Sequence, residues 1–140
     1  MKAIPFRLLA ILYVLMLLLA AVVPFQQGES LSDTYTLHIR GDYLLHAIFY
    51  IPLPVFLRLA FGNPAGRLGR KVWIPVLLLA FSAVILFEGV QYWIPYRGFN
   101  INDMMANGVG VLLGSLFCLV LRSFLTRLLP APSAERKREL

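Results

Sequence analysis

Four long apolar runs, separated by shorter polar segments, dominate the pattern of the chain. They cover roughly residues 4–23, 43–61, 72–93 and 104–121. In a helix, about 20 mostly apolar residues cross the roughly 30 Å of hydrocarbon in a bilayer. The pattern therefore predicts an all-α fold, an integral membrane four-helix bundle formed by residues 1–128. Residues 129–140 are polar, basic and rich in proline, and we expect a disordered cytoplasmic tail there.

Two of these runs carry features that modify the simple picture. Pro52 and Pro54 fall inside the second run and predict a kink or a broken helix, because proline lacks the N–H that a helix needs. The first run has a basic start, with Lys2 before it and Arg7 near its beginning, as a signal peptide would. It is longer than a usual signal-peptide core, and no small-x-small cleavage site follows, so a retained span is the favoured interpretation.

Composition and charge agree with a membrane protein. The 140 residues are 59% hydrophobic and 14% charged, whereas soluble domains are closer to half apolar. The net charge of +6 does not indicate nucleic-acid binding, because the basic residues flank the apolar runs and form no stripe. The single cysteine, Cys118, lies inside an apolar run and is expected to act as a small buried hydrophobic residue.

The distribution of basic residues predicts the orientation in the membrane. Lys and Arg are frequent before the first run, between the second and third, and after the fourth, whereas the other two connections each carry one, Arg40 and Arg97. By the positive-inside rule, both termini lie in the cytoplasm and residues 24–41 and 94–102 face outward. The expected location is the cytoplasmic (inner) membrane, with several passes.

Polar residues gather at the outward ends of three of the predicted spans. Spacings of three or four residues place each pair on one helix face. The set comprises Asp42, His46 and, one turn on, Tyr50; Glu88 and Gln91; Arg97 in the short outer loop; and Asp103 and Asn107. These residues come from three helices, yet they are expected at one depth and on one side of the membrane. This arrangement favours a shared polar site.

Glu88 is the most informative member of this set. It lies five residues before Trp93, an interface residue, and therefore about 7 Å deeper in the membrane. A charge there is costly and Glu cannot reach water as Lys or Arg can. We expect Glu88 to face the interior and to pair with His46 or Arg97, or to stay protonated.

Less specific interpretations exist for the other residues. Asp42 and Asp103 stand where helix N-caps stand, and His46 could be an interfacial histidine that donates to a carbonyl. Gln91 and Asn107 could hydrogen-bond between helices. The small residues of the fourth span are expected to permit close helix packing; they are Gly108, Gly110 and Gly114.

The segments "DYLLHAIFY" and "FEGVQYWIPYRGFNINDMMANGVGVLLG" resemble the VanZ-like family of small bacterial membrane proteins. The family pattern is an Asp with a His four residues later and a Tyr soon after, then Glu-x-x-Gln or Glu-x-x-His, an Arg, and Asp-x-x-x-Asn-x-x-Gly. The chain departs from it at Tyr43, where the family often has a lysine. The resemblance implies a link to low-level glycopeptide (teicoplanin) resistance, in a family whose biochemical activity is not established.

Two functions compete at this stage. In the first, the outward site binds or processes a polar lipid or a cell-envelope precursor. Glu88, His46 and Asp103 would be catalytic, and the ligand-binding residues would be Asp42, Tyr50, Gln91, Arg97 and Asn107. In the second, the polar cluster only fixes helix packing in a non-catalytic membrane partner or structural protein.

The remaining predictions concern ligands and partners. A metal site is a minor third possibility, with Asp42, His46, Glu88 and Asp103 as hard ligands but no chelating motif. No cofactor follows from the sequence. The expected partners are a membrane lipid or a lipid-linked envelope precursor, with a homo-oligomer or a membrane-protein partner also open, and no nucleic acid.

Overall fold

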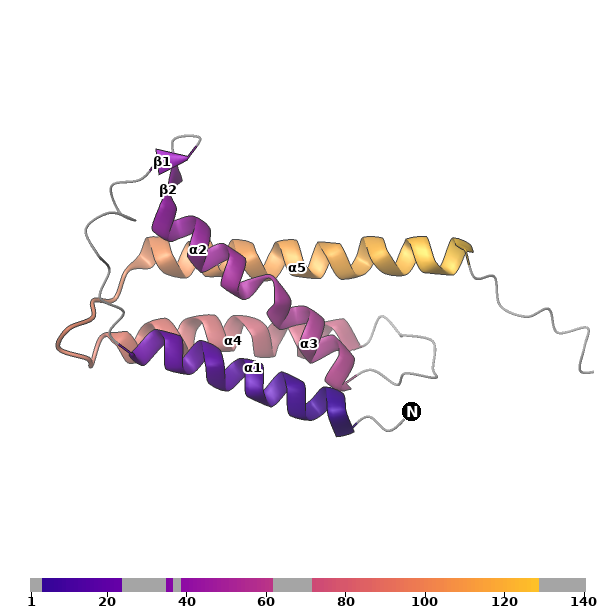
Figure 1. Cartoon of the computed structure of the whole chain (residues 1–140), viewed down its shortest axis with the longest axis horizontal. Helices are drawn as coiled ribbons and strands as arrows, with labels where there is room; N and C mark the ends of the chain where they lie inside the picture. The colour runs from indigo at the N-terminus through magenta and orange to yellow at the C-terminus, as the bar shows by residue number, and fades with distance from the viewer. Residues whose placement is uncertain (1–3, 24–34, 37–38, 62–71, 129–140) are drawn as a thin grey trace, which may run out of the picture.

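The computed structural model describes residues 4–23, 35–36, 39–61 and 72–128. It confirms an all-helical bundle with four segments long and apolar enough to cross a membrane (Figure 1). The first is α1 (Ile4–Val22). The second comprises α2 (Gly41–Tyr50) and α3 (Pro52–Phe61). The third is α4 (Trp73–Gln91) and the fourth begins α5 (Ile101–Leu128).

A short antiparallel pair of strands precedes α2. It consists of β1 (Tyr35–Thr36) and β2 (Ile39–Arg40), with Tyr35 opposite Arg40. The strand β2 runs directly into α2, which begins at Gly41. The pair was not predicted, and it leaves the membrane-spanning part entirely helical. The expected tail, residues 129–140, lies outside the described residues.

The second span is broken at Ile51, as the two prolines predicted. Helix α2 ends at Tyr50 and α3 begins at Pro52, and the bend is visible in Figure 1. Since Pro52 and Pro54 lack an N–H, the carbonyls one turn earlier lose donors. The Tyr13 hydroxyl of α1 donates to the Phe49 carbonyl oxygen next to the break, at 2.7 Å. This hydrogen bond joins α1 to the second span beside the break. It is an additional contact, because the carbonyls that lose a proline donor belong to Ile48 and Tyr50.

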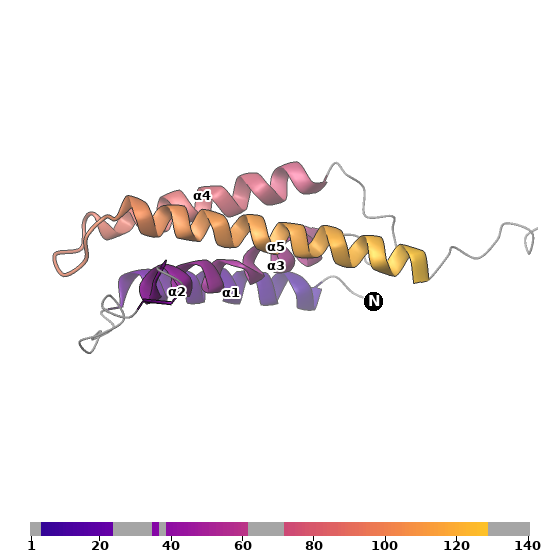
Figure 2. The ribbon, with the colours of Figure 1, turned by 90° about the horizontal axis from the view of Figure 1, so that it is seen from above.

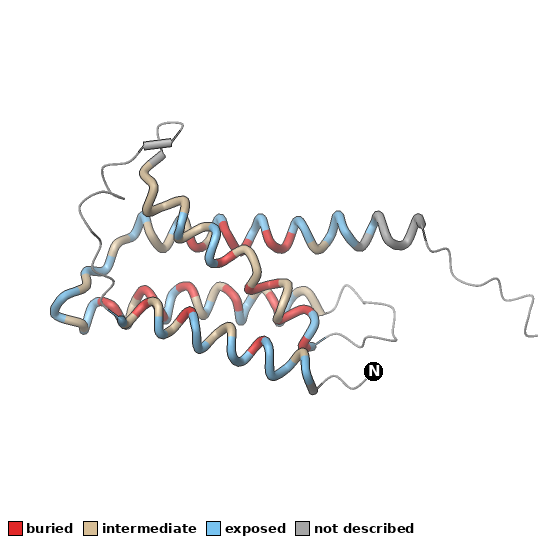
Figure 3. The backbone as a smooth tube through the Cα atoms, in the orientation of Figure 1, coloured by how far each residue is buried: buried red, intermediate tan, exposed pale blue. Residues whose placement is uncertain are grey.

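The interior and the exterior of the bundle are both apolar. Small and branched side chains such as Leu53, Val76, Ala80, Val84 and Val111 form the buried core. Large apolar side chains lie on the outer faces of all four spans, and Figure 3 shows exposed positions recurring along each helix between buried and intermediate ones. A soluble protein rarely exposes apolar surface this extensive, whereas a protein surrounded by lipid is expected to.

Helix α5 packs closely against the second span, and two glycines permit this. A Cβ at Gly110 would collide with the Ala47 carbonyl oxygen and lie 2.9 Å from Tyr50 Cβ. A Cβ at Gly114 would collide with the Ile51 carbonyl oxygen, at the break. Gly108 differs, because its added Cβ would lie at an ordinary 3.6 Å from the Phe81 ring. The predicted packing role is therefore performed by Gly110 and Gly114.

The helices run so that one end of the bundle collects the predicted site. There α1 ends, α2 begins, α4 ends and α5 begins, at the left of Figure 1 and again in Figure 2. We call it the polar end, because it holds Asp42, Glu88 and Asp103. The start of α1, the end of α3 and the start of α4 lie at the opposite end.

Candidate functional site

Glu88 occupies a fully buried position near the end of α4. Its relative exposure is 0%, whereas the next turn of the chain carries the exposed Tyr92 and Trp93. The backbone N–H of Asn100 donates to Glu88 Oε1 at 3.1 Å. Glu88 Oε2 is also buried and has no hydrogen-bond partner among the described residues. The structure therefore satisfies one oxygen of this carboxyl group and leaves the other open.

Asn100 connects Glu88 to Asp103 and was not recognised from the sequence. Its side-chain nitrogen donates to Asp103 Oδ1 at 2.9 Å, and its side-chain oxygen accepts from the Asn102 N–H at 3.0 Å. The second bond makes Asn100 the N-cap of α5. Asp103 lies inside the first turn of α5. The prediction that Asp103 caps the helix is therefore wrong, and Asn100 is the cap. The sequence signal that could have identified this cap was an Asn shortly before the predicted fourth span.

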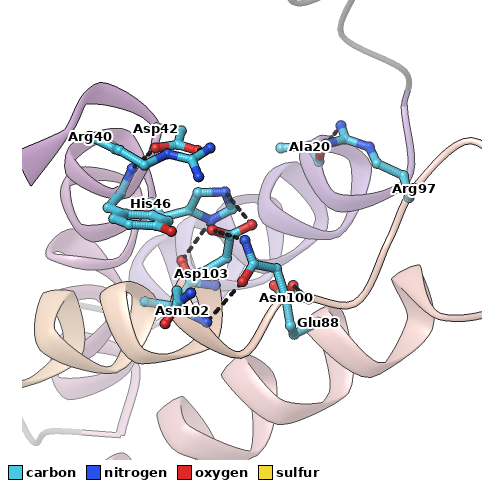
Figure 4. A network of polar contacts seen from close by, with 11 residues as sticks. Ala20, Arg40, Asp42, His46, Glu88, Arg97, Asn100, Asn102 and Asp103 are labelled. Carbon is cyan, nitrogen blue, oxygen red and sulfur yellow. Dashed lines mark hydrogen bonds and ion pairs between the residues drawn. The ribbon is translucent and has the colours of Figure 1, made fainter. Parts of the chain in front are cut away.

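His46 joins the second span to α5. Its Nδ1 lies 3.1 Å from Asn107 Oδ1, and its Nε2 lies 3.6 Å from Asp103 Oδ2. Asp103 and Asn107 therefore face one partner, as their i, i+4 spacing predicted. Asn107 is buried, whereas the side chain of His46 is 26% exposed and that of Asp103 is 16% exposed. We call the connected set the His46 cluster; its members are His46, Glu88, Asn100, Asp103 and Asn107. Figure 4 labels the first four of them.

Asp42 lies next to the cluster and uses both carboxylate oxygens locally. Arg40 donates to Asp42 Oδ2 at 2.7 Å, and the Tyr43 N–H donates to Oδ1 at 2.9 Å. The second contact satisfies one of the free N–H groups in the first turn of α2. Asp42 is therefore not the N-cap of α2, a position that Arg40 holds, but an acidic residue of the first turn that satisfies one N–H there. Arg40, which the sequence interpretation used only to count charge, also lies over the Tyr43 ring, 5.0 Å from its centroid.

Arg97 is directed away from Glu88, toward the end of α1. Its guanidinium donates to the carbonyl oxygens of Ala20 and Val23, at 3.2 and 2.6 Å. The hydroxyl of Tyr96 donates to the Val22 carbonyl at 3.2 Å. Helix C-termini present free carbonyls and a partial negative charge, which attract a cation. Arg97 thus binds the last turn of α1 and makes no ion pair with Glu88. Figure 4 shows the side chains of Arg97 and Glu88 well separated.

Tyr50 and Gln91 are buried near the site without joining the cluster. Tyr50 ends α2 and packs against Gly110, and Gln91 ends α4. Among the described residues, neither shares a hydrogen bond with a cluster side chain. In the part of the chain that the structure describes, no group of three or more His, Cys, Asp or Glu side chains is placed to bind a metal ion. The four residues considered as metal ligands therefore form no such group; they are Asp42, His46, Glu88 and Asp103.

A second buried polar residue, at the opposite end of the bundle, also went unrecognised. Arg58 of α3 is 4% exposed, and its guanidinium lies 5.4 Å from the centre of the Trp73 ring. Trp73 begins α4, so this cation–π contact joins the second and third spans. An arginine inside the apolar segment "PVFLRLAF" was the available signal.

The chemistry of the His46 cluster follows from these contacts. If Asn107 Oδ1 accepts a hydrogen from Nδ1, the neutral His46 ring keeps its lone pair on Nε2. That nitrogen faces Asp103, and the His46 side chain is partly exposed. The cluster can therefore accept a proton or a hydrogen bond at His46, Asp103 and Glu88.

The comparison with known protein families agrees with the resemblance noted in the sequence. The VanZ/LLP1 family model matches residues 6–122, which include α1 from its third residue on and the whole His46 cluster. Neither a curated protein sequence nor a solved structure matches the chain. The match spans most of the chain, and the protein belongs to the VanZ/LLP1 family.

Proposed function

We propose that this multi-pass member of the VanZ/LLP1 family binds the head group of a polar lipid, or of a lipid-linked envelope precursor, at its polar end. The observation that carries the proposal is Glu88. One of its oxygens is buried and has no hydrogen-bond partner among the described residues. Asn100 connects the same carboxyl group to Asp103, which lies beside His46, and both of these side chains are partly exposed. A ligand group would supply the missing partner.

The unpartnered oxygen of Glu88 is energetically costly, which favours a ligand-binding role for it. A buried polar atom left without a hydrogen bond costs about 1–3 kcal/mol, and more when it is charged. Buried polar groups are nearly always paired, so an exception calls for a reason. An ionisable residue inside a membrane span is a functional candidate by default. A role in ligand recognition explains why a carboxyl group stands inside an apolar span.

The proposal includes the side of the membrane. Basic residues favour cytoplasmic termini, so the polar end faces the outer leaflet of the cytoplasmic membrane. Polar lipids and the lipid-linked precursors of the envelope are present there. A protein that binds or processes them would alter access to envelope precursors, which fits the glycopeptide resistance implied by the resemblance.

The cluster also has groups suited to a reaction on the head group. His46 Nε2 could accept a proton from water or from a hydroxyl, and Glu88 or Asp103 could hold one. Hydrolysis or transfer at the head group would follow from this arrangement. Binding is the core of the proposal, and catalysis by Glu88, His46 and Asp103 is its extension.

The second candidate is a non-catalytic partner or structural protein. Its support is that hydrogen bonds from Asn100 and Asn107 tie α2, α4 and the start of α5 together. In that case the polar contacts fix helix register only. Removing them would lower stability and leave lipid content unchanged.

The proposal can be tested by identifying the lipids that the protein retains. The full chain would be expressed and purified in mild detergent, and its bound lipids would be measured by mass spectrometry against the total membrane extract. We expect one class of polar lipid or precursor to be enriched on the wild-type protein. In His46→Ala and Glu88→Gln, that enrichment should fall at least about fivefold, because each loses an acceptor.

Two measurements keep the result interpretable. Circular dichroism and thermal unfolding show whether each variant remains folded, and Ser82→Ala, at an exposed position on α4, serves as the matched control. Equal lipid profiles for the wild type and both variants, with lower unfolding temperatures in the variants, would favour the structural function. No enriched lipid on the wild-type protein would contradict the proposal.

A further inference from the structure

We infer that the group received by the His46 cluster is a protonated primary amine. The inference rests on the proposed function and specifies the chemistry of its ligand. The cluster offers hydrogen-bond acceptors and negative charge in one place, and the nearby arginines are directed elsewhere. An ammonium group meets both conditions.

The charge balance of the cluster is the first step. Glu88 and Asp103 bring two carboxyl groups, joined by Asn100, and Figure 4 shows all three side chains together. Arg97 donates to the end of α1, and Arg40 pairs with Asp42. The charges of Arg97 and Arg40 still act on Glu88 and Asp103, and so does that of Asp42 on Asp103. The three carboxyl groups outnumber the two arginines by one, so the balance stays negative with a neutral His46. Two acidic groups in a poorly hydrated site favour a cationic ligand and disfavour an anionic one.

The open atoms of the cluster are the second step. Asn100 occupies Glu88 Oε1 and Asp103 Oδ1, so each carboxyl group keeps its other oxygen for a ligand. Glu88 Oε2 has no described partner, and Asp103 Oδ2 lies 3.6 Å from His46 Nε2, beyond hydrogen-bond distance. In the tautomer that carries its hydrogen on Nδ1, toward Asn107 Oδ1, His46 offers Nε2 as a third acceptor beside Asp103 Oδ2.

A primary ammonium group fits three acceptors. It carries three N–H donors and no acceptor, like the head of a lysine side chain. A quaternary amine has the same charge and no N–H, so it could not bond to these atoms. A phosphate or carboxylate would bring more acceptors to a site that already has them. The partly exposed His46 and Asp103 would be met first, with the buried Glu88 beneath them.

The test compares lipids that differ only in this group. The full chain, in detergent micelles or nanodiscs, would be titrated with phosphatidylethanolamine, phosphatidylcholine and phosphatidylglycerol of matched acyl chains, and binding would be read by native mass spectrometry. The first two have the same phosphate and the same net charge. We expect phosphatidylethanolamine to bind at least about tenfold more tightly than either of the others.

Variants locate the effect. Asp103→Asn keeps an oxygen for the Asn100 contact and removes the charge, and Glu88→Gln replaces the open oxygen or its partner with an amide. Each should reduce the affinity for phosphatidylethanolamine at least tenfold and abolish the preference over phosphatidylcholine. Ser82→Ala should behave as the wild type. Should the variants prove unfolded, competition on the wild-type protein decides: ethanolamine should displace the lipid and choline should not.

The outcomes separate this inference from the proposed function. If a polar lipid binds through Glu88 and His46 with no preference for the primary amine, the amine inference is overturned and the proposed function stands. If none of the lipids binds and no lipid co-purifies, the proposed function fails as well. The amine could also belong to a polyprenyl-linked precursor. In that arm, a precursor with a free amine should bind and its N-acetylated form should not.

Discussion

At the scale of single residues, Asn100 organises the site more than any residue of the family-like pattern. Its backbone N–H, side-chain nitrogen and side-chain oxygen each make a different hydrogen bond, to Glu88, Asp103 and the first turn of α5. One residue thereby starts a helix and places two carboxyl groups beside each other. Neither carboxyl group would be held in this way by its own helix alone.

These roles of Asn100 can be separated by two substitutions. Asn100→Ser keeps a cap for α5 and loses the nitrogen that contacts Asp103, whereas Asn100→Ala loses both. Loss of a cap costs about 1 kcal/mol, and loss of a hydrogen bond to a charged group costs about 1.5–3 kcal/mol. We expect stability to fall in the order wild type, Ser, Ala, as measured by thermal unfolding in detergent. Identical values for Ser and wild type would show that the Asp103 contact contributes nothing.

At the scale of helices, the fit of α5 against the second span depends on backbone contact. The carbonyls of Ala47 and Ile51 lie directly against Gly110 and Gly114, one turn apart on α5. The break at Ile51 and the close approach therefore occur at the same place. This contact also holds His46 opposite Asn107 and Asp103, because all three lie on the same pair of helices.

Alanine substitutions test this arrangement with a control on the same helix. Gly110→Ala and Gly114→Ala would push α5 away from the second span, and overpacking of this kind typically costs about 1–3 kcal/mol. Gly108→Ala meets only an ordinary contact, and alanine is the better helix former by up to about 1 kcal/mol. Unfolding in detergent should show the first two variants destabilised and Gly108→Ala unchanged or stabilised. Destabilisation by Gly108→Ala alone would contradict the packing described.

At the scale of the whole molecule, the four spans place all the chemistry of the described site at one end. The loop between α4 and α5 also holds the end of α1, through Arg97 and Tyr96. α1 is accordingly part of the bundle, which supports its interpretation as a retained span. The functional meaning of the polar end depends on the side of the membrane it faces.

Chemical labelling of cysteines tests that orientation. In a Cys118→Ser background, Asn102→Cys places a thiol at an exposed position of the polar end, and Ser133→Cys places one in the tail. A membrane-impermeant maleimide should label Asn102→Cys in intact spheroplasts and Ser133→Cys only after permeabilisation. The opposite pattern would turn the site toward the cytoplasm and contradict the orientation inferred from the basic residues.

The sequence by itself determined the class, the number of spans and the end of the bundle at which the candidate site residues lie. These follow from local properties: apolar length sets the spans, proline breaks a helix, and periodicity places Asp103 and Asn107 on one face. It also placed Glu88 inside the membrane, because an acidic residue so close to Trp93 must be deeper than the interface.

Only the tertiary structure decided which of these polar residues meet. Arg97 contacts the end of α1 because the α4–α5 loop passes over free carbonyls there, a fact of helix arrangement that no spacing reveals. Asn100 links Glu88 to Asp103 because the ends of α4 and α5 lie side by side, and Asp42 is occupied by Arg40. Hydrogen-bond partners depend on distances between segments far apart in the chain. The pattern could therefore predict that a polar site exists, whereas the packing of helices selected its members.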